Sequence, residues 1–421
     1  MNATVTAPLP LQETAAPTDE AGVAALITAA HKSRTPVYPI GGGTSLDYGP
    51  RPARPGIGLS LGSMNRVLDH PADDLTITVE AGLTLAELNR HLASKRQWLP
   101  IDAPQPARAT VGGIVATNAC GPRRYARGTI GDYLIGVRAV DGCGEAFSGG
   151  GRVVKNAAGY NLPRLMVGSL GTLGVITQAT FMVRPLPVDS ALVTCDVTGF
   201  QQAECLLVAL GRSLATATIV ELLAGPALPD CPLPALPDRA AARLAVGFEG
   251  SPAEVQGMTA ALCDQWQALG ADGLATINGA RVEAVWTWLS ESPALLQINV
   301  LPSRLVGVME QVTGELPAMP LQAHAGNGVI RIYWPVDREK VPSFPAPLPQ
   351  AGEGSFAGLV QNTLRPIAEA AGGHLTVLAT PPDVELAPAE IWGPPRPGAA
   401  LMRSIQQRFD PAGILNPGRF L

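Results

Sequence analysis

The segment Pro39-Ile40-Gly41-Gly42-Gly43-Thr44-Ser45 constrains the fold of this chain more than any other stretch. Three consecutive glycines have no side chains to pack, so their backbone can adopt positive φ angles and direct several N–H groups at one anion. No Lys follows the glycines, and position 46 is Leu, so the segment is neither a Walker loop nor the Rossmann spacing G-x-G-x-x-G. It predicts a phosphate-binding cradle, and the alternative is an ordinary glycine-rich turn between strands.

Length and charge restrict the class of protein. A chain of 421 residues is expected to form roughly two to three domains. The net charge is −5 and no block of like charges occurs, so we expect neither nucleic acid nor an anionic membrane surface as a partner. The sequence contains no secretory start and no run of ~18 apolar residues. We therefore expect a cytoplasmic protein without direct membrane insertion, associated with a membrane only through partner subunits, if at all.

The cysteines stand singly, without a C-x-x-C pair, at Cys120, Cys143, Cys195, Cys205, Cys231 and Cys263. Such spacing supplies no ligand set for zinc or for an iron–sulfur cluster. We therefore expect reduced cysteines within the core.

Apolar periodicity predicts mixed α and β structure up to about residue 187. Helices are expected over residues 20–33 and from Leu85, where Thr84 and Glu87 form a capping box. Strands are expected at residues 37–40, 57–61, 75–80 and 135–139. Between residues 101 and 118 the side chains are small and turn-forming, which would let another molecule lie against the backbone.

Beyond a boundary near Pro185-Leu186-Pro187, strands and helices are expected to alternate. The expected strands are residues 191–195, 219–223, 242–248, 296–300 and 329–334. The expected helices are residues 201–214, 252–269, 282–289 and 356–371. This alternation predicts a sheet covered on one face, and a last helix, 399–409, is expected to return to the first domain.

Three ordered motifs carry a resemblance to a known family. They are P-I-G-G-G-T-S at 39–45, P-x-x-A-T-V-G-G-x-x-A-T-N-A-C-G at 106–121, and K-N-x-x-G-Y-N-L-x-x-L-x-x-G-S-L-G-T-L-G-V-I-T at 155–177. Together they resemble the FAD-binding domain of the vanillyl-alcohol oxidase or para-cresol methylhydroxylase (PCMH-type) superfamily. Residues 409–419 resemble the closing segment of its 2-hydroxy-acid and D-lactate dehydrogenase branch. Residues 151–169 are most similar to the FAD-binding subunits of bacterial glycolate oxidases.

The resemblance implies an α+β fold. A PCMH-type FAD-binding domain of two α+β subdomains would span residues 1–187. An α+β cap or substrate domain, with a sheet covered by helices, would span 188–394, and a C-terminal segment, 395–421, would return to the FAD domain.

The resemblance also implies which residues hold FAD. These are Pro39, Ile40, Gly41, Gly42, Gly43, Thr44, Ser45, Pro104, Thr110, Gly112, Gly113, Thr117, Asn118, Gly121, Gly171, Gly174, Ile176 and Asn416. In covalent members a His beside the glycine loop attaches the flavin, whereas the nearest histidines here, His31 and His70, stand well away in the sequence. We therefore predict non-covalent FAD.

Oxidation of a 2-hydroxy acid requires a base for the hydroxyl proton and an anchor for the carboxylate. By the resemblance, catalytic relatives carry H-x-G-D-G-N-x-H, whose histidines hold a divalent metal. Here the segment reads His324-Ala325-Gly326-Asn327-Gly328-Val329-Ile330-Arg331, and Arg331 would repel a cation. We predict no metal site, with His324 and Arg331 as candidate catalytic residues. The alternatives are a vestigial site and a structural, hydrogen-bonded histidine.

Three further features have open interpretations. His374 stands alone before an expected strand, either as a site residue or as a structural histidine. Trp392 precedes a proline-rich loop and either borders the flavin or packs in the core. Arg123, Arg124 and Arg127 follow the second motif and form either an anion site or a solvated basic turn.

The favoured function is an FAD-binding subunit of a glycolate oxidase type complex, which oxidises a small 2-hydroxy acid by hydride transfer to flavin. Because the chain has no cluster motif, a catalytic flavoprotein subunit and an iron–sulfur subunit are the expected partners. One alternative is a self-sufficient, metal-independent FAD dehydrogenase. Another is a structural subunit whose FAD does not turn over.

Overall fold

A computed structural model describes residues 9–151, 160–226, 230–291, 294–334, 355–381, 384–395 and 397–420. Its contacts divide the chain into two compact units. Unit 1 comprises the described residues of Met1–Gly121, Gly128–Leu186 and Pro394–Leu421, and unit 2 those of Pro122–Arg127 and Pro187–Gly393. The start of the third motif, residues 155–159, lies outside the described residues.

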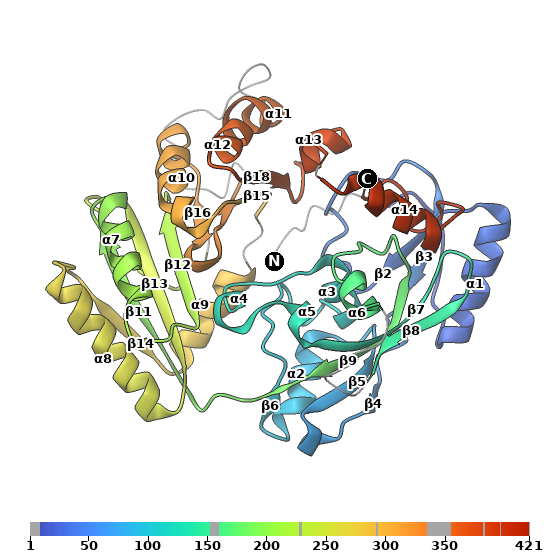
Figure 1. Cartoon of the computed structure of the whole chain (residues 1–421), viewed down its shortest axis with the longest axis horizontal. Coiled ribbons are helices and arrows are strands. Elements are labelled where there is room, and N and C mark those ends of the chain that lie inside the picture. Colours follow the sequence, from blue (N-terminus) through green and yellow to red (C-terminus); the bar gives the residue numbers. More distant parts are fainter. Residues whose placement is uncertain are drawn as a thin grey trace. The chain divides into compact units, whose positions relative to one another are not determined.

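Unit 1 contains two main sheets (Figure 1). A parallel sheet has the order β1 (Leu11–Ala15), β3 (Gly56–Ser60) and β2 (Val37–Ile40). An antiparallel sheet has the order β4 (Val67–Asp69), β5 (Thr76–Glu80), β9 (Val175–Met182), β7 (Leu134–Val140) and β8 (Ala146–Gly150). Separately, β6 (Gln97–Trp98) pairs with β10 (Arg184–Pro185). The helices of the unit are α1 (Glu20–Ser33), α2 (Leu85–Ala93), α3 (Val111–Thr117), α5 (Ile130–Tyr133), α6 (Leu162–Met166) and α14 (Ala399–Phe409), with a 3₁₀ turn η1 (Ala72–Asp74).

The helices of unit 1 begin where the sequence offers a cap. The Asp19 side chain accepts the N–H of Gly22 at 2.8 Å, which starts α1. The predicted capping box of Thr84 and Glu87 is confirmed at the start of α2. The predicted strands near residues 37, 57, 75 and 135 are confirmed to within one residue at each end. The turn-rich interpretation of residues 101–118 is wrong in part, because Thr110 caps helix α3 there.

The C-terminal segment lies along the edge strand β2. Leu415 forms a parallel bridge with Val37, and the backbone N–H of Asn416 donates to the carbonyl of Val37 at 2.8 Å. Ile414 and Leu415 are fully buried in the core of the unit. The Asn416 side chain donates to the carbonyl of Leu170 at 2.7 Å, so two loops distant in sequence are held together.

The buried carboxylate of Glu80 makes the stability of unit 1 depend on pH. The Arg66 guanidinium donates to Glu80 at 2.7 and 3.1 Å, and these bonds lower the pKa of Glu80 below its usual 4.5. Because the folded pKa is the lower one, the stabilisation is complete above about pH 4.5 and is lost as the pH falls through the folded-state pKa. We expect the unfolding temperature of unit 1 to fall below pH 4.5 less steeply in Glu80→Gln than in the wild type, as calorimetry at several pH values would measure. Equal slopes for the two proteins would contradict this assignment.

Unit 2 is built on an eight-stranded sheet whose neighbouring strands are all antiparallel. The order is β14 (Ala275–Asn278), β11 (Asp189–Val197), β13 (Ala242–Gly250), β12 (Ile219–Ala224), β16 (Leu321–His324), β17 (Val329–Ile332), β15 (Leu296–Asn299) and β18 (His374–Val377). The helices are α4 (Arg124–Arg127), α7 (Phe200–Gly211), α8 (Pro252–Ala268), α9 (Ala280–Glu291), α10 (Pro302–Glu315), α11 (Phe356–Leu359), α12 (Arg365–Ala370) and α13 (Pro388–Trp392). A π-helical turn, η3 (Val360–Leu364), joins α11 to α12, and a 3₁₀ turn, η2 (Ala325–Asn327), joins β16 to β17.

The strands and helices expected beyond residue 187 are confirmed, but four others were missed. These are β14, β16, α10 and α13. The helical spacing of Leu305, Met309 and Val312 was available as a signal for α10, whereas β16 is only four residues long and mixes polar with apolar side chains. The expectation of one covered face is also incomplete. Helices α7, α8, α10 and α12 pack on one face, and α9 packs on part of the other (Figure 1).

The two faces of this sheet differ in polarity because successive side chains alternate. One face supplies apolar side chains such as Leu222, Leu244 and Ile330 to the main core of the unit. The opposite face of strands β12, β16, β17, β15 and β18 is here called the polar face. It carries Glu221, Gln322, His324, Arg331, Gln297, Asn299, Thr376 and His374, which the cross-strand register places opposite one another.

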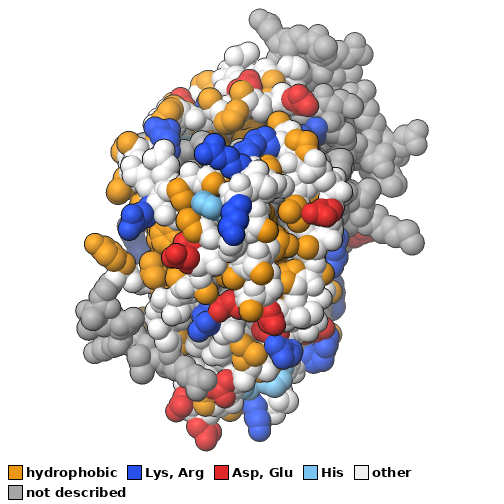
Figure 2. Space-filling view, turned by 90° about the vertical axis from the view of Figure 1, so that its right-hand side faces the viewer, with side chains coloured by type: hydrophobic (Ala, Val, Ile, Leu, Met, Phe, Trp, Pro, Cys, Tyr) orange, Lys and Arg blue, Asp and Glu red, His pale blue; other side chains and the backbone are white. Residues whose placement is uncertain are grey.

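Within the described ranges, no helix combines the length and the apolar character needed to cross a membrane. Figure 2 shows a face of the molecule on which basic, acidic and apolar side chains are interspersed. The six cysteines are free. Cys120 and Cys195 are buried as expected, but Cys205 lies exposed on α7, so the expectation of core cysteines is wrong there.

Candidate functional site

Most of the residues predicted to hold FAD line one groove of unit 1. The open volume of the groove is about 1080 Å³. The predicted residues that line it are Pro39, Gly41, Gly42, Gly43, Thr44, Ser45, Pro104, Thr110, Gly112, Gly113, Thr117, Gly171, Gly174, Ile176 and Asn416. Three segments far apart in the sequence therefore converge on one surface, and each presents mainly small side chains and backbone.

Three predicted residues do not line this groove. Ile40 ends strand β2. Asn118 adopts the left-handed conformation (φ 54°) that ends α3, and its Oδ1 is buried without a hydrogen-bond partner among the described residues. The backbone N–H of Gly121 donates to Asp102 at 3.0 Å. Ile40 and Asn118 therefore stand at the ends of elements next to the groove, and Gly121 lies in the loop that follows α3.

Positions 41–43 of the glycine loop accept only glycine. A Cβ on Gly42 would lie 1.7 Å from the carbonyl oxygen of Arg108, and a Cβ on Gly41 would lie 2.2 Å from Oγ1 of Thr110. Gly43 has a φ of 69°, which residues with a side chain rarely adopt. The loop therefore presses against residues 108–110, and its exposed backbone suits a pyrophosphate better than a bulky or apolar ligand.

One charged residue of the groove, Arg419, was not predicted from the sequence. Its guanidinium donates to the backbone carbonyls of Leu46, Tyr48 and Pro50, which follow the glycine loop. Burial lowers the pKa of Arg419 to about 10, because the charged form loses water. Its place in the C-terminal motif was a signal, but only the return of that segment to β2 brings it to the loop.

In unit 2, His324 stands at the end of β16 on the polar face. Its side chain is 1% exposed, and its Nδ1 lies 2.7 Å from Oε1 of Glu221, which is fully buried on β12. Gln322 donates to the other oxygen of Glu221 at 2.7 Å and to the carbonyl of Leu289 at 3.0 Å, and Tyr333 donates to Gln322. Nε2 of His324 is buried and has no hydrogen-bond partner among the described residues.

The other candidates of unit 2 also lie on or near the polar face. Arg331 is opposite Gln322 on one side and Gln297 on the other, so it shares a face with His324. His374 Nε2 lies 3.2 Å from the amide nitrogen of Asn299. Trp392 is half-buried against the main core, which favours the packing interpretation. Among the described residues, no group of three or more His, Cys, Asp or Glu is gathered as a metal site.

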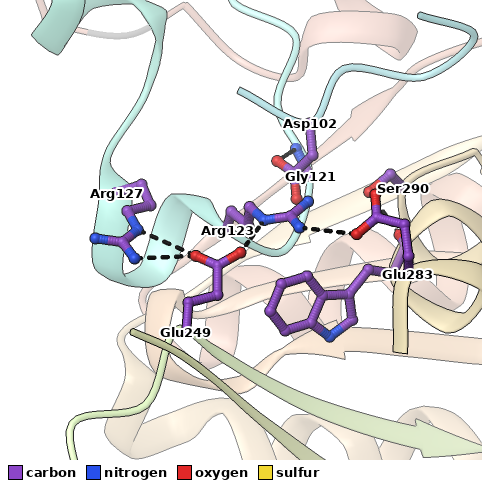
Figure 3. A network of polar contacts seen from close by, with 8 residues as sticks. Asp102, Gly121, Arg123, Arg127, Glu249, Glu283 and Ser290 are labelled. Atoms are coloured by element: carbon purple, nitrogen blue, oxygen red, sulfur yellow. Dashed lines mark hydrogen bonds and ion pairs between the residues drawn. The ribbon is translucent and has the colours of Figure 1, made fainter. Parts of the chain in front are cut away.

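The basic cluster after the second motif is not a solvated turn (Figure 3). Arg123 and Arg127 both bind Glu249, with N–O distances of 2.8 and 3.0 Å, and the Glu249 side chain is 1% exposed. The Arg123 guanidinium also lies 4.2 Å from the ring centre of Trp286 and 3.5 Å from Glu283. These contacts hold the segment Pro122–Arg127 in unit 2, although the chain on either side of it belongs to unit 1.

Two family models match the chain. A model described as FAD binding domain covers residues 12–150, and a model described as FAD linked oxidases, C-terminal domain, covers residues 395–420. The first contains the glycine loop and the second contains Asn416 and Arg419. The two matched segments therefore both contribute residues to the groove.

The chain is also similar to curated proteins. It is 26% identical to glycolate oxidase subunit GlcD of Bacillus subtilis over 96% of this chain and 87% of that protein. It is 38% identical to glycolate oxidase subunit GlcE of Escherichia coli over 31% of this chain and 38% of that protein. D-lactate dehydrogenases of Arabidopsis thaliana, Danio rerio and Archaeoglobus fulgidus are 32–37% identical, but the chain matches only 36–44% of their length.

Among solved structures, an alkyldihydroxyacetonephosphate synthase superposes with a TM-score of 0.67. The match covers 96% of this chain and 76% of that chain at 17% identity, which supports the fold alone. The predicted α+β fold with a PCMH-type FAD-binding domain is confirmed. Because the glycine loop leaves room only for backbone and lines a groove made mainly of small side chains, the residues present also fit the cofactor. The chain therefore contains an FAD-binding domain and a C-terminal segment similar to that of FAD-linked oxidases, and it is an FAD-dependent oxidoreductase.

Proposed function

We propose that the chain is the FAD-binding subunit of a glycolate oxidase type complex, which oxidises a small 2-hydroxy acid to the 2-oxo acid. The observation that carries the proposal is that the groove fitted to FAD is joined, in one chain, to a sheet face bearing His324 and Arg331. Similarity to glycolate oxidase subunits and D-lactate dehydrogenases supports this substrate class, since their names specify 2-hydroxy acids.

In this proposal, unit 1 holds FAD without a covalent bond. Gly41–Ser45 would direct backbone N–H groups at the pyrophosphate, and the small residues around Gly112 and Gly171 would lie along the rest of the cofactor. Bound FAD supplies a hydride acceptor for the carbon that bears the hydroxyl group.

Unit 2 is the substrate domain in this proposal. Arg331 is the group that would hold the substrate carboxylate, because a guanidinium can donate two parallel hydrogen bonds to it. His324 would take the hydroxyl proton at Nε2. Neither role requires a metal ion, consistent with Arg331 standing where the motif of metal-binding relatives has a second histidine.

The proposal includes partners. Electrons must leave the flavin, and the cysteines of this chain stand singly, so we propose an iron–sulfur subunit and a second, catalytic flavoprotein subunit. We place the complex in the cytoplasm, with any membrane contact made by those subunits. A self-sufficient dehydrogenase remains the second candidate, because His324 and Arg331 are present together on the polar face.

Anaerobic flavin reduction tests these functions. The purified chain with FAD is mixed with glycolate or D-lactate, and absorbance near 450 nm is followed with and without its partners. We expect bleaching only in the complex, at a rate that His324→Ala lowers by about 10²-fold or more, because a general base contributes about 10²–10⁴. Bleaching by the isolated chain would establish the second candidate instead. Absence of bleaching, or an unchanged rate in His324→Ala, would contradict the catalytic roles.

A further inference from the structure

We propose that Glu221 is a positioning residue that fixes the tautomer of His324, so that the proton lies on Nδ1 and the lone pair lies on Nε2. The inference rests on the proposed function, because it assigns how His324 would act as a base. Glu221 precedes His324 by 103 positions and lies in none of the sequence motifs.

Each carboxylate oxygen of Glu221 has its own hydrogen-bond partner. Gln322 Nε2 donates to Oε2 of Glu221 at 2.7 Å, and the same amide group donates to the carbonyl of Leu289. Tyr333 donates its hydroxyl hydrogen to the amide oxygen of Gln322, which fixes the orientation of that amide. Oε1 of Glu221 is then left for Nδ1 of His324, 2.7 Å away.

The proton between Glu221 and His324 belongs on the ring nitrogen. A carboxylate oxygen can only accept a hydrogen bond, so Oε1 of Glu221, 2.7 Å from Nδ1, accepts from an Nδ1–H group. In the neutral ring this leaves Nε2 with a lone pair. Nε2 of His324 is buried and has no hydrogen-bond partner among the described residues. The ring nitrogen that can accept a proton is therefore the one that no described residue occupies.

The surroundings of the Glu221 carboxylate supply hydrogen-bond donors and a basic side chain on the same face of the sheet. A buried carboxylate needs a compensating charge or several donors. Glu221 receives two donors, and the strand register places Arg331 opposite Gln322, on the same face. The arrangement therefore holds a carboxylate at the Nδ1 edge of the His324 ring and places Arg331 on β17, the strand next to β16.

The tautomer is measured directly by nitrogen NMR. The FAD-loaded chain is labelled with ¹⁵N-histidine, and long-range ¹H–¹⁵N spectra are recorded at neutral pH, with His324→Gln used to assign the signal. His31 is an internal standard, because its Nδ1 lies 2.8 Å from the carbonyl of Gly142 and must donate to it. We expect His324 to show the same pattern as His31. A protonated Nε2 in the wild type would overturn the proposal.

A matched pair of variants separates positioning from general destabilisation. Glu221→Gln is expected to convert His324 to a mixture of tautomers and to lower flavin reduction by about 10²- to 10³-fold, with the half-saturating substrate concentration changed less than about 3-fold. Glu249→Gln, which alters another buried carboxylate of the same sheet, should leave the His324 signal unchanged. An unchanged tautomer in Glu221→Gln would overturn the proposal.

The two measurements also separate this inference from the proposed function. If His324 carries its proton on Nδ1 but no 2-hydroxy acid bleaches the flavin, the positioning role of Glu221 in catalysis is refuted together with the proposed function, while the tautomer assignment stands. If the flavin is bleached but Nε2 carries the proton, the inference alone fails. Should Glu221→Gln not fold, the wild-type spectrum still decides the tautomer.

Discussion

A protein in which Gly42 is replaced by alanine is expected to lose its yellow colour. The added Cβ would lie 1.7 Å from the carbonyl oxygen of Arg108, 2.5 Å from its carbonyl carbon and 3.3 Å from the nitrogen of Ala109. All three are backbone atoms, so no side-chain rotation relieves the clash, and the glycine loop must move away from residues 108–109. We expect FAD affinity to fall by at least about 100-fold, which corresponds to about 2.7 kcal/mol.

The cofactor content is measured from the ratio of absorbance near 450 and 280 nm after gel filtration. Acid precipitation of the wild type should release the colour into the supernatant, as expected for non-covalent FAD, and colour in the pellet would refute that form of attachment. Gly62→Ala is the matched control in the same unit, because the nearest atom to its Cβ would be Oγ of Ser60 at 3.6 Å. Equimolar FAD in Gly42→Ala would show that this loop is not the cradle.

Replacement of Glu249 by leucine is expected to cost unit 2 about 3–5 kcal/mol of unfolding free energy. The substitution removes the carboxylate shared by Arg123 and Arg127 (Figure 3). The Arg123 side chain is only 10% exposed, and the carboxylate of Glu283, at 3.5 Å, is itself largely exposed and compensates poorly. A buried charge that loses its principal partner is costly because it cannot regain water.

Urea unfolding followed by circular dichroism measures this loss, and two controls sharpen it. Glu283→Gln alters the exposed carboxylate of the same network, so it should cost less than about 1 kcal/mol. The double variant Arg123→Met with Glu249→Leu should be more stable than Glu249→Leu alone, because no buried guanidinium is then left beside a missing carboxylate. A double variant whose loss equals the sum of the single losses would refute the coupling.

Features that depend on residues a few positions apart in the sequence were predicted correctly, and features that depend on distant residues were not. The capping box of Thr84 and Glu87 and the strand from residue 75 to 80 depend on neighbours a few positions away, and the structure confirms both. The sequence left Arg123 open between an anion site and a solvated basic turn, and it is neither of these. Its burial depends on Glu249 and Trp286, more than 120 positions later, which no local pattern indicates.

The sequence by itself determined that residues 41–43 present only backbone atoms, because three consecutive glycines carry no side chains. Motif order then sufficed to predict a flavin domain. Only the tertiary structure decided what His324 can do, since its partner Glu221 is on β12 and the strand order β12, β16, β17 sets which side chains face each other. Register across a sheet is fixed by the packing of the whole unit, so the pairing of these two residues could not be found from the sequence of either strand.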